Sequence, residues 1–116
     1  MAFDPTKQVE RRRYARTSFS AELLITNPRG QPPCKGHSID VSRAGIGFFS
    51  ERFLDPGTQA QITIRTRRRG EPVTAVVPAT IRWCKFDEAG AIAGAEFDDP
   101  ISPSTHPELC ECVDEL

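Results

Sequence analysis

Apolar and polar residues alternate along most of the chain, in short runs that favour β-strands over helices. In the two clearest runs the predicted inward positions are Phe19, Ala21, Leu23 and Ile25 of residues 18–26, and Ala60, Ile62 and Ile64 of residues 59–67. The other predicted strands cover residues 35–41, 45–50, 73–85 and 91–97. Six short strands separated by turn residues predict an all-β fold, a small six-stranded antiparallel β-barrel that leaves no unpaired sheet edge.

Proline and glycine mark the turns between these strands. Asp55-Pro56-Gly57 is a strong turn signal, and Arg68-Arg69-Gly70-Glu71 predicts a hairpin. Pro78 lies inside the fifth run and lacks a backbone donor, which predicts a bulge or an edge position there.

The last residues follow a helical pattern instead. Thr105 and Glu108 are three residues apart, as in a capping box, and Pro107 stands early in the predicted helix. The helix is expected to continue to about residue 115 and to cover one opening or face of the barrel. Its narrow apolar stripe consists of Leu109, Cys112, Val113 and Leu116.

A chain of 116 residues fits one domain. We expect a flexible arm over residues 1–10, the barrel over residues 11–100 and a helical tail over residues 101–116. No apolar run approaches the length of a membrane span, and the N-terminus lacks the apolar core of a signal peptide, so we expect a cytoplasmic protein. The four cysteines, two of them in a Cys110-x-Cys112 pair, are expected to be free structural thiols rather than metal ligands.

Charge is unevenly spread although the net charge is only −1. The basic residues Lys7, Arg11, Arg12, Arg13 and Arg16 crowd one short segment, whereas residues 96–116 carry seven acids and no Lys or Arg. This segregation opposes binding of a nucleic-acid polymer, which prefers a basic domain, and permits a compact site for a small anion.

One polar stretch stands between two apolar strands, at residues 40–45. Asp40 and Ser42 are two positions apart, so in extended chain they point to the same face, and Gly45 then lets the chain bend, with a positive φ if the turn requires one. Taken alone, Asp-x-Ser before a glycine is most often a turn with local side-chain capping. The alternative is a carboxylate and a hydroxyl presented to a ligand.

The arginines supply chemistry that complements this pair. A guanidinium group binds phosphate oxygens bidentately, stacks on flat rings and matches the O6 and N7 edge of guanine. A carboxylate such as that of Asp40 can accept from the N1–H and N2–H₂ donors on guanine's other edge. An arginine cluster alone is most often a solvated basic arm, but the two segments together fit a ligand that contains both guanine and phosphate.

The two segments resemble the signature of the PilZ domain family, bacterial receptors for cyclic di-GMP. That signature is R-x-x-x-R followed by [D/N]-x-S-x-x-G, and here it reads Arg12-Arg13-Tyr14-Ala15-Arg16 and Asp40-Val41-Ser42-Arg43-Ala44-Gly45. The resemblance covers roughly residues 10–98, including Ile46-Gly47-Phe48 and Gly94-Ala95-Glu96-Phe97. It implies a six-stranded antiparallel barrel with an arm that carries the arginines.

The resemblance also implies roles for single residues. Arg12 and Arg16 would bind guanine and phosphate, Asp40 and Ser42 would bind a guanine from the barrel surface, and Gly45 would keep the turn open. An arginine just before the first motif arginine, here Arg11, accompanies a stacked pair of ligand molecules in the family, which implies two cyclic di-GMP molecules per domain. Some members place an aromatic residue near the ligand where Trp83 stands; packing of Trp83 inside the barrel is the open alternative.

These observations favour a receptor without catalysis or cofactor, whose arginine arm closes over the ligand and changes the surface seen by a downstream protein partner. A barrel that binds a protein and no ligand is the alternative. A single-strand nucleic-acid barrel would need more aromatic platforms than Tyr14 and Trp83. An enzyme fits poorly because the only histidines, His37 and His106, have no nucleophile or metal set near them in the sequence.

Overall fold

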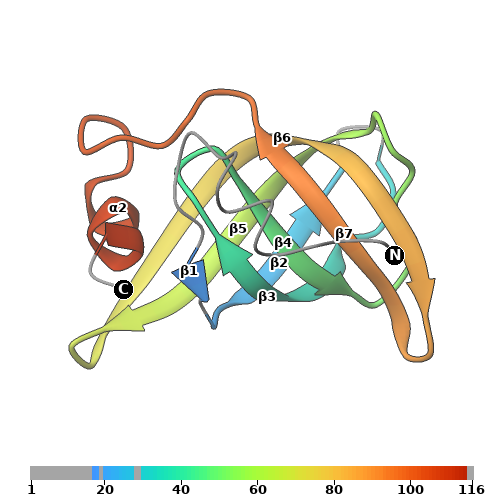
Figure 1. The fold of residues 1–116 in the computed structure, drawn as a ribbon, viewed down its shortest axis with the longest axis horizontal. Coiled ribbons are helices and arrows are strands. Elements are labelled where there is room, and N and C mark those ends of the chain that lie inside the picture. The colour runs from blue at the N-terminus through green and yellow to red at the C-terminus, as the bar shows by residue number, and fades with distance from the viewer. Residues whose placement is uncertain (1–16, 19, 28–29, 115–116) are drawn as a thin grey trace.

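A computed structural model describes residues 17–18, 20–27 and 30–114, and Figure 1 shows them as a closed antiparallel β-barrel with one helix at its end. Six strands form the barrel wall in the order β3-β2-β5-β6-β7-β4, and pairing of β3 with β4 closes it. The two-residue strand β1 pairs with the end of β3, and β2 pairs with its beginning. The elements are β1 (Thr17–Ser18), β2 (Glu22–Thr26), β3 (Cys34–Val41), β4 (Gly45–Ser50), β5 (Gln59–Arg68), β6 (Glu71–Asp87), β7 (Gly90–Phe97) and α2 (Pro107–Asp114).

The predicted alternation sorts the side chains as expected. Ile62 and Ile64 on β5 and Ile46 and Phe48 on β4 are fully buried, while the residues between them on β5 are at least partly exposed. One cluster of buried apolar residues fills the barrel and continues into α2. The prediction of a six-stranded antiparallel barrel with a short C-terminal helix is therefore confirmed.

The first predicted strand, residues 18–26, is divided into β1 and β2. The interruption lies at Ala21, whose N–H donates to Oγ of Ser38 at 2.8 Å and whose carbonyl accepts from the N–H of Ser38 at 3.0 Å. The Oγ of Ser38 thus takes the place of a backbone acceptor for the N–H of Ala21. On either side of Ala21, β1 pairs with the end of β3 and β2 pairs with its beginning. Phe19, predicted to point inward, lies outside the described residues.

Pro78 lies neither at a bulge nor on an edge strand, the two roles predicted for it, but in β6 just before pairing with β7 begins. Its carbonyl accepts from the N–H of Asp98 at 2.9 Å, on the side of β6 that faces β7, and pairing with β7 begins only at Ala79. Because N and O of one residue point to the same side of a strand, the missing N–H of Pro78 removes no bond to β5. The bulge of β6 lies later, between Ile81 and Trp83.

Helix α2 packs against one end of the barrel, with Leu109, Cys112 and Val113 buried as predicted and Cys110 buried with them. The predicted capping box does not form. The helix begins at Pro107, and its first turn is closed by the N–H of Cys110 donating to the carbonyl of His106. Thr105 lies one residue earlier, and its Oγ1 accepts from the N–H of Ser102 at 3.0 Å. Leu116, the last residue of the predicted stripe, lies outside the described residues.

No helix in the described part of the chain has the length and apolar character needed to span a membrane. All four cysteines are free thiols, and three of them, Cys34, Cys110 and Cys112, are buried. The Sγ of Cys34 lies 3.1 Å from Oγ of Ser50, within the core.

Candidate functional site

Asp40 lies near the end of β3 and faces outward. Its partner across the strand pair is Gly47 of β4, which stands between the fully buried Ile46 and Phe48. Because side chains alternate along a strand, position 47, and Asp40 opposite it, point away from the core. The carboxylate is therefore at the outer surface of the barrel, half-buried, as the sequence predicted.

The strand that follows the arginine segment lies directly beside Asp40. Thr17 pairs with Val41, and Ser18 pairs with Asp40. Arg16 is bonded to Thr17 in the sequence. The three predicted arginine contacts, Arg11, Arg12 and Arg16, lie outside the described residues.

Ser42 shapes the turn between β3 and β4. Its Oγ accepts a hydrogen bond from the N–H of Ala44 at 3.1 Å, and its own N–H donates to the carbonyl of Gly45 at 2.9 Å. The residue is 4% exposed. This is the local capping that such a pattern often forms, and it uses the hydroxyl as an acceptor, which leaves the hydroxyl hydrogen to donate.

Gly45 is required by packing and not by a left-handed backbone. The described glycines with positive φ are Gly30, Gly57, Gly70 and Gly90. At position 45 a Cβ would stand 2.5 Å from the carbonyl oxygen of Ala95, closer than real Cβ atoms come. The glycine thus lets β4 and β7 approach each other next to the turn, for a different reason from the bend that the sequence suggested.

A single row of residues crosses four strands at this level of the barrel. Asp40 of β3 pairs with Gly47 of β4, Gly47 with Gly94 of β7, and Gly94 with Trp83 of β6. A Cβ at Gly94 would overlap the indole ring of Trp83, so the ring lies against this glycine on the outer surface. Trp83 is half-buried there and is not part of the interior core, which rules out the alternative of packing inside the barrel.

Two β-bulges lie at the ends of this row, and neither position was predicted from the sequence. One interrupts β3 between Ser38 and Asp40, and the other interrupts β6 between Ile81 and Trp83. A bulge adds one residue to a strand and re-aims the side chains beside it. On β6 it allows Arg82 and Trp83, which are neighbours in the chain, both to lie at the outer surface.

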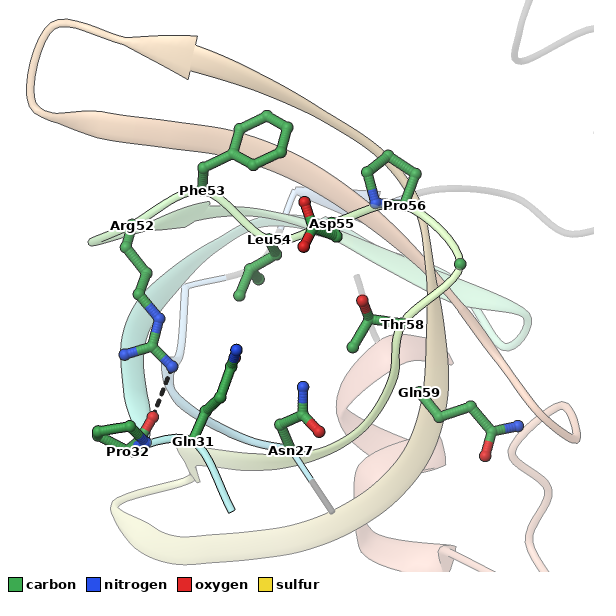
Figure 2. A pocket seen from close by; sticks show the side chains of 11 residues that line it. Asn27, Gln31, Pro32, Arg52, Phe53, Leu54, Asp55, Pro56, Thr58 and Gln59 are labelled. Atoms are coloured by element: carbon green, nitrogen blue, oxygen red, sulfur yellow. Dashed lines mark hydrogen bonds between the residues drawn. The ribbon is translucent and has the colours of Figure 1, made fainter. Parts of the chain in front are cut away.

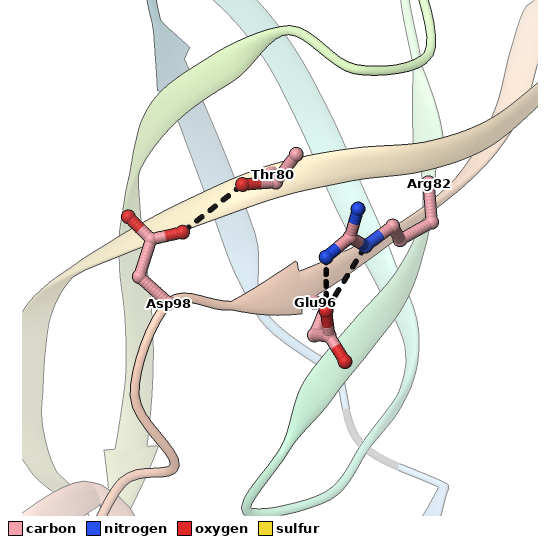
Figure 3. A network of polar contacts seen from close by, with 4 residues as sticks. All are labelled: Thr80, Arg82, Glu96 and Asp98. Carbon is pink, nitrogen blue, oxygen red and sulfur yellow. Dashed lines mark hydrogen bonds and ion pairs between the residues drawn. The ribbon is translucent and has the colours of Figure 1, made fainter.

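Arg82 belongs to a polar network that the sequence did not predict. Its Nε and Nη2 donate to Oε1 of Glu96 at 2.9 and 2.5 Å, and Oγ1 of Thr80 donates to Oδ1 of Asp98 at 3.0 Å (Figure 3). The Arg82 and Glu96 side chains are 59% and 55% exposed, so the pair contributes at most about 1 kcal/mol to stability. Glu96 is the cross-strand partner of Gly45. Arg82, Glu96 and Asp98 line a shallow cleft of about 560 Å³ that also reaches Ala44 of the turn.

A larger cleft of about 900 Å³ opens at the other end of the barrel, far from the 40–45 turn along β3 and β4 (Figure 2). Leu54 points into it, and Asn27, Gln31 and Asp55 stand at its rim. Nη2 of Arg52 donates to the carbonyl of Pro32 at 2.5 Å and ties the two rim loops together. This cleft is therefore separate from Asp40, Ser42 and Gly45.

The two histidines take part in local contacts. Nε2 of His37 lies 3.2 Å from Oγ of Ser20, and Nε2 of His106 lies 3.0 Å from the carbonyl oxygen of Val76. Among the residues that the structure describes, no three His, Cys, Asp or Glu side chains are grouped so as to hold a metal ion.

Comparison with known proteins identifies the fold and the family. The family model of the PilZ domain matches residues 10–115. No curated protein matches the sequence. Three solved structures illustrate the likeness of the fold.

The PilZ domain of YcgR from Escherichia coli, solved with c-di-GMP, is 20% identical, with 91% of each chain covered and a TM-score of 0.69. The Bacillus subtilis inhibitor of motility, MotI/DgrA, is 18% identical with a TM-score of 0.69; the match covers 90% of this chain but only 51% of that protein. The PilZ domain of CeSA from a cellulose-synthesizing bacterium is 16% identical, covering 86% of this chain and 95% of that one, with a TM-score of 0.55.

Proposed function

Because the chain belongs to the PilZ domain family, we propose that it is a receptor for cyclic di-GMP that signals through a downstream protein partner. The observation that carries this proposal is the pairing of Ser18 with Asp40. Thr17 and Ser18, the first described residues after the arginine segment, pair with Val41 and Asp40. The segment that follows the arginines thus reaches Asp40, which supports a site built from two halves of a motif that are 24 positions apart in the sequence.

Each motif residue has a chemical role in this proposal. The carboxylate of Asp40 accepts from N1–H and N2–H₂ of a guanine, and the Ser42 hydroxyl holds the turn and donates its hydrogen. Arg12 and Arg16 bind phosphate and the O6 and N7 edge of a guanine. Gly45 keeps the β4–β7 contact that fixes the turn. Trp83, at the other end of the row, offers its ring face for stacking on a purine.

Binding orders the arginine arm in this mechanism. Arg11, Arg12, Arg13 and Arg16 repel one another, and a ligand with two phosphates and two purines offsets that repulsion. The arm then folds onto the barrel beside Asp40 and changes the charged surface that a partner meets. NMR of residues 5–17 tests this step: equal order with and without ligand would contradict it.

Arg11 adds a prediction about stoichiometry. An arginine at this position provides one more planar cation to bind a second, stacked ligand molecule, so two cyclic di-GMP molecules are expected per domain. Replacing Arg11 with alanine should reduce the stoichiometry from two to one without abolishing binding. A single site in the unaltered protein would contradict this part of the proposal and leave the receptor function intact.

Calorimetric titration with cyclic di-GMP tests the proposed function. Cyclic di-AMP is the control ligand, because the adenine edge lacks the adjacent N1–H and N2–H₂ donors that a carboxylate accepts. Binding of cyclic di-GMP but not cyclic di-AMP supports the proposal. No heat with either ligand at tens of micromolar concentration would favour the alternative, a PilZ barrel that acts only as a protein-interaction module.

A further inference from the structure

A row of exposed arginines lies on the outer face of β5. Ile62 and Ile64 of this strand point into the core and are fully buried, so Arg65 and Arg67 point outward, and both are exposed. Alternate residues of a strand are roughly 6.7 Å apart, so the Cα atoms of Arg65 and Arg67 are separated by about this distance. Arg69, exposed at the tip of the following hairpin, continues the row beyond the barrel.

Neither Arg65 nor Arg67 is ion-paired with another residue of the described chain. Nη1 of Arg67 donates to the carbonyl of Gly70 at 3.0 Å, which uses one of its donors and holds the side chain along the hairpin. Arg68 points to the other face of β5 from Arg65 and Arg67. It pairs with helix α2, where its Nη1 lies 3.2 Å from Oε2 of Glu111. Arg65 and the remaining donors of Arg67 are therefore open to a group outside the chain.

An uncharged strip borders the arginines on β6. Arg67 pairs with Pro72, Arg65 with Thr74, and Thr63 with Val76. Val76 is 47% exposed, a large value for an aliphatic side chain. Guanidinium groups beside an exposed, uncharged strip match an extended segment in which carboxylates alternate with uncharged residues.

Acidic residues next to the row argue against a broad polyanion as the occupant. Glu22 of β2 is the cross-strand partner of Arg65, and Glu71 is the partner of Arg68. A nucleic-acid backbone or an anionic membrane needs a wide, uniformly positive surface, whereas the net charge of this chain is −1. A short acidic protein segment needs only a narrow positive surface, such as the arginine row provides.

The tip of the hairpin retains an arginine in a costly conformation. Arg69 has φ of 52° and Gly70 has φ of 81°, the pattern of a two-residue turn in which Asn, Asp or Gly is usual. The left-handed region costs a residue with a Cβ about 1–2 kcal/mol. Arg69 adds a third exposed positive charge at this end of the surface.

We propose that Arg65, Arg67 and Arg69, together with the strip Pro72, Thr74 and Val76, form a docking surface for an acidic, extended segment of a partner protein. This surface lies on β5 and the first half of β6. The row from Asp40 to Trp83 lies on β3, β4, β7 and the second half of β6. The docking surface is thus separate from this row, so the chain can hold a ligand at the row and a partner on a different face.

The test measures binding of a fluorescein-labelled peptide in which glutamate alternates with valine, by fluorescence anisotropy on the full chain. The variant Arg65→Glu/Arg67→Glu reverses two charges of the row. The control Lys35→Glu/Lys85→Glu makes the same change in charge at two exposed lysines of other strands. We expect affinity to fall roughly tenfold or more in the arginine variant and by less than about twofold in the control.

Equal losses in both variants would show nonspecific attraction and overturn the proposal, as would absence of peptide binding to the unaltered protein. Tighter binding to a single-stranded oligonucleotide or to phosphatidylserine vesicles than to the peptide would also overturn it. Circular dichroism verifies that each variant is folded. If charge reversal disturbs the strand, the Arg65→Gln/Arg67→Gln variant replaces Arg65→Glu/Arg67→Glu. It removes the two charges without reversing them and should also lower peptide affinity.

Discussion

Asp40 and Trp83 lie at opposite ends of one row on the outer face of the barrel, separated only by Gly47 and Gly94. Because glycine has no side chain, nothing from β4 or β7 stands between the carboxylate and the indole within the row. The Cα positions of Asp40 and Trp83 are three inter-strand steps apart, each about 4.8 Å. A planar ligand can therefore meet a hydrogen-bond acceptor at one end and an aromatic face at the other.

The Asp40 carboxylate is expected to be necessary for ligand affinity and dispensable for folding. Asp40→Ala should weaken cyclic di-GMP binding by about 1–3 kcal/mol, roughly ten- to hundredfold, because a bidentate contact to guanine is lost. Asp55→Ala is the matched control, since Asp55 is an exposed aspartate at the rim of the opposite cleft. Calorimetry gives the affinities, and Arg16→Ala should show a loss like that of Asp40→Ala.

Circular dichroism distinguishes a ligand contact from a structural residue in this pair of variants. An unfolded Asp40→Ala protein would mean that the carboxylate holds the β3 end in place. Equal affinity of Asp40→Ala and Asp55→Ala would remove Asp40 from the proposed site.

Trp83 is expected to report directly on the ligand. It is the only tryptophan in the chain, so intrinsic fluorescence has a single source. A purine stacked on the indole should quench or shift its emission, and Trp83→Ala should cost about 1–3 kcal/mol of affinity while Trp83→Phe costs less. Identical emission without ligand and at saturating cyclic di-GMP would mean that Trp83 does not contact the ligand and serves only to cover Gly94.

Period-two alternation was sufficient to predict the barrel, because one face of each strand is buried and the pattern shows which. Ile62 and Ile64 illustrate this. The bulges beside Asp40 and Trp83 could not be predicted in the same way. The extra residues, Ile39 and Arg82, are of types that are common in regular strands, so the sequence does not distinguish them. The row between them depends on strand register, which is a long-range property of the folded sheet.

The 40–45 turn shows a similar division. The residue types of Asp40, Ser42 and Gly45 predicted a turn here, and local capping was one of the two interpretations of Ser42, but the reason for Gly45 was not predicted. Ser42 caps the turn locally, and Gly45 is there because β7 approaches closely. The capping box predicted at Thr105 was wrong because it requires Thr105 to be the N-cap residue. The first helical turn is closed one residue later, at the carbonyl of His106.

Gly45→Ala should test the close approach of β4 and β7. The added Cβ would meet the backbone oxygen of Ala95, which cannot rotate away, so the strands must separate. We expect the free energy of unfolding to fall by about 1–3 kcal/mol, as for other overpacked sites. Urea denaturation measures it, and a midpoint unchanged from the unaltered protein would mean that the sheet adjusts without cost.

Leu109 should anchor α2 to the end of the barrel. It is 1% exposed, so Leu109→Ala removes a fully buried side chain and should lower the free energy of unfolding by about 2–5 kcal/mol. Glu108→Gln, one residue earlier and exposed, is the control and should change it by less than about 1 kcal/mol. Similar denaturation midpoints for the two variants would show that the barrel is stable without the helix.

Arg69→Asn should separate stability from docking at the β5–β6 hairpin. Asparagine tolerates the left-handed conformation better than arginine, so the free energy of unfolding should rise by roughly 1 kcal/mol. The same change removes the outermost guanidinium of the arginine row, so affinity for the acidic peptide should fall. Thermal unfolding and anisotropy on one preparation measure both effects. A variant that gains stability and keeps full peptide affinity would show that Arg69 is a tolerated defect of the turn, and would restrict the docking surface to Arg65 and Arg67.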